Sequence, residues 1–209
     1  MRILNEAISI PAPLDEAIQR TFLESAPEKA AARLGASLAN LWPRLAKDRG
    51  QESRNHYSLS SAEALAYAAY YLPANCLKLP TILAEAESFG IDLFSGEETS
   101  WVDVGSGPGT ALAGLTFFAE KSQRSIRLTS LDQSRNFLEH AGRLHSELRR
   151  SYPAAKLAHE AQMAPKAAKE LSEKILEKKP RVVSFLNSLA EILPALEERA
   201  AWMKNLIDG

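Results

Sequence analysis

The sequence predicts an α/β protein, in which a helical N-terminal domain precedes a domain built on a parallel sheet. Three observations predict this class. The first part of the chain is rich in alanine and has the apolar spacing of helices. After about residue 97, short β-branched segments alternate with amphipathic ones, which is typical of parallel sheets with right-handed crossovers. The 209 residues are 45% hydrophobic, enough for a real core. We therefore expect a helical domain over 1–96 and a sheet domain over 97–209.

In the first part, four helical segments and one polar linker are predicted. The helical segments cover 13–33, which is one or two helices, 36–47, 60–72 and 75–88, and the linker covers 48–57. Ser60 or Ser61 is a good cap for the third helix. Pro43 should kink or end the second helix, Pro73 should start a new helix, and Pro80 should bend the fourth. Gly90 suits the end of that helix, because glycine adopts the left-handed conformation without strain.

In the second part, strands and helices alternate. The predicted strands are 101–104, 125–131, 155–160 and 181–186, and the predicted helices are 110–121, 134–150, 165–178 and 193–207. Ser134 is expected to cap the second of these helices. Its buried stripe is expected to consist of Phe137, Ala141, Leu144 and Leu148.

Composition excludes several classes of protein. With 25 Lys+Arg against 26 Asp+Glu, the chain is not a polycation, so any nucleic-acid contact must come from a local patch. The lone cysteine, Cys76, excludes a disulfide framework. No segment approaches the roughly 18 apolar residues of a membrane span, and residues 1–6 do not form a signal peptide. We expect a cytoplasmic protein without a metal site. The four histidines are expected on the surface or on helix faces: His56, His140, His145 and His159.

The informative motif is a glycine loop between a strand and a helix. The first strand runs through Asp103 into a turn with glycines at its first, third and fifth positions. Glycine permits positive φ and close approach of a ligand to the backbone, and the following helix offers free N–H groups to an anion. Asp132 ends the second strand, where a carboxylate can accept both ribose hydroxyls of a nucleoside. The predicted cofactor-binding residues are Asp103, Gly105, Ser106, Gly107, Gly109 and Asp132.

Alternatives to this interpretation remain. The loop could be a tight turn without a ligand. A dinucleotide is disfavoured because its fingerprint, G-x-G-x-x-G, needs glycine where Thr110 stands. Walker-type phosphate binding fails because no Gly-Lys-Ser/Thr follows. The glycine spacing and the acid two residues before it favour S-adenosylmethionine.

At these residues the chain resembles a known family, the methyltransferase-like assembly factors of the small ribosomal subunit. Over about residues 60–209, the segments that carry the resemblance are 66–75, 101–111, 130–134 and 185–192. The resemblance implies a Rossmann-like class I methyltransferase domain that acts on or beside small-subunit ribosomal RNA. Members carry a cysteine cluster that this chain lacks, so we expect no iron–sulfur cluster. Their sheet has seven strands, so we expect this chain, which stops after the fourth, to be a C-terminally truncated first half.

The sequence does not identify a catalytic residue. Asn187-Ser188 is either substrate-facing or a polar strand exit, and Glu191 is either a base or a helix-terminal acid. Cys76 is expected to be a buried structural cysteine. For Tyr70-Tyr71 and Trp101, a place in the core or at a domain interface is favoured over a role as base-stacking platforms. Residues 121–151 hold seven basic side chains against three acids, which is either an RNA-binding patch or a solvated helix face.

The sequence thus supports three functional hypotheses. The first is an S-adenosylmethionine-dependent methyltransferase acting on small-subunit ribosomal RNA. The second is a non-catalytic assembly factor that keeps the cofactor pocket. The third, disfavoured by the glycine spacing, is an NAD-dependent oxidoreductase.

Overall fold

The structure is a computed structural model, which describes residues 9–23, 32–41, 59–94, 96–186, 188 and 196–208. The predicted linker 48–57, the expected effect of Pro43, and the weighed residues Asn187 and Glu191 lie outside these ranges.

Four parallel strands form the central sheet. They are β1 (Thr99–Val104), β2 (Ile126–Asp132), β3 (Leu157–Met163) and β4 (Val182–Ser184). Their spatial order is β3-β2-β1-β4, so successive strands are added on one side of β1 until β4 crosses to the other side. The α/β class with a parallel sheet is confirmed. In such sheets, ligands bind beyond the carboxyl ends of the strands, at the point where the order reverses. Here that point lies between β1 and β4.

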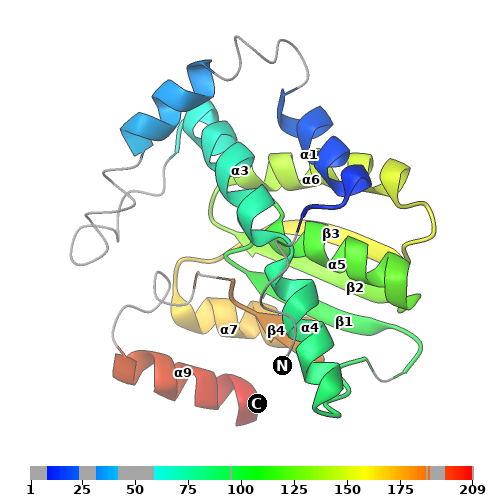
Figure 1. The fold of residues 1–209 in the computed structure, drawn as a ribbon. Coiled ribbons are helices and arrows are strands. Elements are labelled where there is room, and N and C mark those ends of the chain that lie inside the picture. Colours follow the sequence, from blue (N-terminus) through cyan, green and yellow to red (C-terminus); the bar gives the residue numbers. More distant parts are fainter. Residues whose placement is uncertain are drawn as a thin grey trace.

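Helices cover both faces of this sheet (Figure 1). One face carries α5 (Thr110–Ser122) and α6 (Arg135–Ser151), and the other carries α7 (Ala168–Glu177) and α9 (Leu196–Asp208). The strands feed two cores, because side chains alternate between the faces. Trp101 belongs to the larger core, whereas Val102 and Val104 pack with α7 and α9. The predicted buried stripe of α6 is confirmed.

The helices before the sheet are α1 (Ala12–Leu23), a helix over 32–41, α3 (Ser61–Asn75) and α4 (Lys78–Ser88). Ser60 caps α3 as predicted, in a reciprocal capping box with Glu63. One proline prediction is wrong, because Pro73 lies inside the last turn of α3 and starts no helix. The predicted helical run 75–88 is divided at residues 76–77, and Pro80 is the third residue of α4, where the N–H groups have no ladder acceptor.

These N-terminal helices share the larger core with the sheet domain. Leu14, Ile18 and Phe22 of α1 pack in the same cluster as Trp101 and Leu144. Gly90 takes a φ of +74° directly after α4, as its predicted role as a helix terminator requires. Among the helices that the structure describes, none is long and apolar enough to cross a membrane. The division of the chain at residue 97 stays a prediction.

Candidate functional site

The glycine loop leaves β1 at the carboxyl end of the sheet and enters α5 directly. Gly105, Gly107 and Gly109 have φ values of +67°, +56° and +105°. Side chains rarely tolerate this left-handed conformation, so the path of the loop itself requires glycine at all three positions. The strand, loop and helix expected from the sequence are therefore all present at the point where the strand order reverses.

The three glycines differ in what lies beside them, at the position that a Cβ atom would take. A Cβ on Gly105 would overlap the side chain of Ser188, whose hydroxyl donates to the carbonyl of Val104 at 2.5 Å. A Cβ on Gly109 would lie 3.2 Å from Leu144 Cδ2, so this glycine lets α6 pack closely on the start of α5. A Cβ on Gly107 would meet nothing within 4 Å. Of the three glycines, Gly107 is thus the one that faces open space.

The backbone N–H groups of the loop are mostly used within the protein. Gly105 and Ser106 both donate to the carbonyl of Leu131, at 2.8 and 3.1 Å. The first ladder bond of α5 runs from Ala113 N–H to the carbonyl of Gly109, and no side chain caps the helix. The N–H groups of residues 110–112 therefore begin α5 without a ladder acceptor, which makes this helix end favourable for an anion.

Asp132, at the end of β2, lies against the loop as the sequence predicted. Its Oδ2 accepts from the N–H of Gly107 at 2.8 Å, and its Oδ1 accepts from the N–H of Ser134 at 2.7 Å. Burial raises the pKa of Asp132, and these backbone donors oppose the rise. The backbone N–H of Gln133 also acts on this carboxylate. Because a carboxylate has about four acceptor sites, acceptor capacity remains for a hydroxyl group of a ligand.

Asp103 is 1% exposed and lies on β1 beside β4. Its Oδ1 accepts from the hydroxyl of Ser184 at 2.6 Å, and Ser184 Oγ accepts from the indole Nε1 of Trp101 at 2.8 Å. Burial raises the pKa of Asp103 to about 7, the Ser184 hydrogen bond opposes the rise, and the charge of Asp132 adds to it. Ser184 is a site residue that was not predicted from the sequence, although its polar side chain in an otherwise apolar strand was a signal.

Ser106 completes the set of predicted site residues. It is 4% exposed, and its Oγ has no hydrogen-bond partner within the described part of the protein. Buried hydroxyl groups are normally hydrogen-bonded, because leaving one unsatisfied costs about 1–3 kcal/mol. This orphaned hydroxyl beside Gly107 therefore favours an additional polar partner at the loop.

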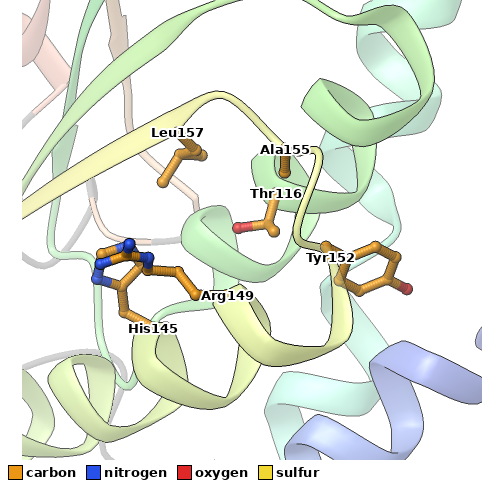
Figure 2. Close-up of a pocket in the computed structure, with 6 residues that line it drawn as sticks. All are labelled: Thr116, His145, Arg149, Tyr152, Ala155 and Leu157. Atoms are coloured by element: carbon orange, nitrogen blue, oxygen red, sulfur yellow. The ribbon is translucent and has the colours of Figure 1, made fainter.

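A separate small cavity lies between α5, α6 and β3, and none of the predicted site residues lines it (Figure 2). In Figure 2 the Tyr152 hydroxyl points away from the other lining side chains, and its oxygen has no partner among the described residues. With a volume of about 10 Å³, the cavity has room for about one water molecule. This cavity is therefore too small for a nucleoside.

Histidines near this cavity correct the sequence expectation. His159 Nε2 lies 3.1 Å from Ser130 Oγ, and the His159 and His145 rings meet with centroids 5.1 Å apart. Burial, with the neighbouring His145, lowers the pKa of His159 to about 4. His140 lies on α6 and is buried against Phe22, so of the two placements expected for it, surface or helix face, the surface placement is excluded.

The remaining expectations give a mixed result. Cys76 and Trp101 are buried as expected, and burial raises the pKa of the Cys76 thiol to about 11. Tyr70 is 52% exposed, so of the two placements expected for it, core or domain interface, the core placement is excluded. Ser188, one of the two residues at the strand exit, is buried against Gly105. Within the described ranges, no group of three or more His, Cys, Asp or Glu side chains could hold a metal ion.

No protein-family model matches the chain, and a search of curated proteins also found no match.

Proposed function

We propose that this protein binds S-adenosylmethionine at the glycine loop and is a methyltransferase-like protein acting on or at small-subunit ribosomal RNA. The observation that carries the proposal is the contact between Asp132 and Gly107 where the strand order reverses. It places a carboxylate with spare acceptor sites beside the one loop glycine that faces open space. Ribose hydroxyls next to bare backbone are the ligand groups that fit this pair.

The other residues of the loop suit the amino-acid end of that ligand. The uncapped start of α5 would receive a carboxylate, and the orphaned Ser106 hydroxyl offers a further hydrogen bond. Asp103 would face a positively charged group. When bound, S-adenosylmethionine supplies an activated methyl group. Its transfer needs chiefly alignment with an acceptor, so the chain's own contribution would be to position the ligand.

Binding of three ligands that contain adenosine tests the ligand class. The strand order β3-β2-β1-β4 also occurs in dinucleotide-binding folds, so topology alone does not separate the two ligands. Isothermal titration calorimetry with S-adenosylmethionine, S-adenosylhomocysteine and NAD separates these two ligand classes. We expect binding of the first two and none of NAD. Binding of NAD alone would refute the proposal and favour an oxidoreductase.

A pair of aspartate variants tests the site. Asp132 and Asp92 each accept a hydrogen bond from the N–H group two residues on, at 2.7 Å from Ser134 and 2.8 Å from Phe94. Asp132 additionally bonds the glycine loop. Asp132→Asn should weaken S-adenosylmethionine binding by about 1–3 kcal/mol, because ribose hydroxyls lose a charged acceptor. Asp92→Asn should leave the dissociation constant unchanged. Equal affinity of both variants would remove Asp132 from the site.

The nucleic-acid part of the proposal rests on the family resemblance and on the basic stretch. Arg135, Arg143 and Arg149 are exposed on α6, whereas Arg150 pairs with Glu147 at 2.5 Å. Such arginines can contact phosphates, and the affinity should then fall steeply with salt. We expect binding to small-subunit RNA that weakens between 50 and about 200 mM salt and weakens further in the triple Arg→Ala variant.

Methyl transfer separates an enzyme from a non-catalytic assembly factor. Small-subunit RNA is incubated with the protein and tritium-labelled S-adenosylmethionine, and the label in the RNA is counted. Incorporation that is lost in Asp132→Asn would support a methyltransferase. Tight cofactor binding without incorporation would favour the assembly factor.

A further inference from the structure

A directional chain of hydrogen bonds crosses from β1 to β4 beneath the glycine loop. Trp101 Nε1, Ser184 Oγ and Asp103 Oδ1 follow one another at 2.8 and 2.6 Å, and all three side chains are buried. An indole N–H can only donate, so Ser184 receives the bond from Trp101 and directs its own single proton to Asp103. The direction of the chain is therefore fixed.

This direction leaves Asp103 free to gain or lose a proton. Its Oδ1 acts as an acceptor whether the acid is neutral or ionised, because Ser184 donates to it in both states. A proton on Asp103 therefore belongs on Oδ2. The chain remains intact when that proton leaves, so a change of charge at Asp103 needs no rearrangement of Trp101 or Ser184.

The surroundings favour the neutral acid when no cation is near. The groups that act on Asp103 are Ser184 of β4, whose hydroxyl favours the ionised form, and Asp132 of β2, whose negative charge opposes it. Burial is the largest influence, and the pKa of Asp103 is about 7. A positive charge brought beside the carboxyl group would favour ionisation strongly in such a buried place.

We propose that Asp103, held by Ser184 and Trp101, exchanges its proton for a positively charged group of the ligand at the glycine loop. Binding of a cationic ligand breaks the O–H bond at Oδ2, and the proton passes to the solvent. The carboxylate that remains then neutralises the ligand's charge. This inference rests on the proposed function, because it takes S-adenosylmethionine, with its sulfonium and ammonium groups, as the cationic ligand.

The exchange makes ligand affinity depend on pH in one direction. With a pKa of about 7, the free protein carries about 0.9 proton on Asp103 at pH 6, about half at pH 7 and about 0.1 at pH 8. Binding should release about these amounts. The Asp103 contribution should make binding about tenfold weaker at pH 6 than at pH 8, since only the ionised acid receives the cation.

The test is calorimetry of S-adenosylmethionine binding at pH 6, 7 and 8, each in two buffers of different ionisation enthalpy. The dependence of the measured heat on the buffer gives the protons released. Asp103→Asn should lose the release, because its amide has the shape and hydrogen-bonding pattern of the neutral acid and cannot ionise. Subtracting the proton release measured with this variant also removes the contribution of the ligand's own amino group, because that contribution is the same for both proteins.

Two serine variants separate a positioning role from a structural one. Ser184→Ala removes the donor that favours ionised Asp103, so the midpoint of proton release should move to higher pH, with more release at pH 8 than in the original protein. Ser100→Ala is the matched control. Ser100 also lies on β1, but its hydroxyl donates to the carbonyl of Lys178 at 3.2 Å and does not touch Asp103. It should leave the midpoint unchanged.

Carbon-13 NMR of the ligand-free protein gives an independent result, with Asp103 assigned from the signal missing in Asp103→Asn. A midpoint near pH 7 is expected. A midpoint below about 5, or binding of S-adenosylmethionine without proton release at pH 6, would overturn this inference and leave the proposed function standing. Absence of binding at all three pH values would refute the proposed function itself, and the inference with it.

Discussion

Gly114, in the middle of α5, lies close against the junction between α3 and α4. A Cβ at this position would lie 2.5 Å from the carbonyl oxygen of Cys76 and 2.9 Å from Cδ of Pro80. Both atoms belong to rigid parts of the junction between α3 and α4, a backbone carbonyl and a proline ring. Neither can swing aside, so Gly114→Ala must push the junction away from α5.

Two opposing effects set the size of the change. Alanine in a helix interior gains about 1 kcal/mol over glycine. Overpacking a well-filled core costs about 1–3 kcal/mol, and contact with backbone belongs to the upper part of that range. The Gly114→Ala variant should therefore be less stable by about 1–2 kcal/mol. Gly142→Ala is the matched control, since Gly142 is exposed within α6 and its Cβ would meet nothing within 4 Å. It should be more stable by about 0.5–1 kcal/mol.

Urea unfolding of the two variants and the original protein, followed by circular dichroism, measures both changes. Opposite signs are expected, with the unfolding midpoint lowered by Gly114→Ala and raised by Gly142→Ala at unchanged m-value. If both substitutions stabilised the protein to a similar extent, α5 would not meet the α3–α4 junction so closely. The packing of the N-terminal helices on the sheet domain would then have to differ from the structure.

Three further predictions concern single groups. Burial lowers the pKa of His159 to about 4 in the folded protein, so its contribution to stability is present above pH 6.5 and is lost as the pH falls toward 4. In urea unfolding at pH 4–7, the loss of folding free energy toward low pH should therefore be smaller in His159→Gln by up to about 3 kcal/mol. Cys76 should react with a thiol reagent at pH 8 about 100-fold more slowly in the native protein than in urea, because its thiol is buried with a pKa of about 11. Gly105→Ala should cost about 1–3 kcal/mol in thermal unfolding, and adding Ser188→Gly should restore part of the loss, because Ser188 fills the space that the Cβ needs.

Most of the strands and helices after residue 97 were predictable, because each carries its own local signal. The buried stripe of α6 and its Ser134 cap are examples, and both are confirmed. The wrong prediction for Pro73 has a different character. Proline is favoured in the first turn of a helix, because its missing N–H group would have had no acceptor there, and Pro80 has such a position in α4. Pro73 instead lies in the last turn of α3, and its local sequence does not distinguish the end of one helix from the start of the next.

The candidate site was predictable only where it is local. Asp103 and the glycines follow one another in the chain, and Asp132 ends the next strand, so they could be assembled from the order of elements. Ser184 hydrogen-bonds to Asp103 and Trp101, although it is 81 and 83 residues away from them in the sequence. That contact requires β4 to cross to the free side of β1, which no spacing within the sequence reveals. Hence the partner that fixes the orientation of Asp103 emerges only from the strand order.

The glycine loop shows why a motif identifies a place in a fold more securely than it identifies a ligand. Its three glycines share positive φ, yet the space beside Gly105 is filled by Ser188 and that beside Gly109 by the packing of α6. The backbone path would thus need all three glycines even in a protein that binds nothing at this loop, and at two of them the protein's own side chains also fill the adjacent space. Only the open space at Gly107, together with the spare acceptor sites of Asp132, distinguishes a ligand site from a tight turn. A substitution that fills that space should therefore abolish binding while changing stability little beyond the strain of the turn, and Gly107→Ala is the variant in which the two effects separate.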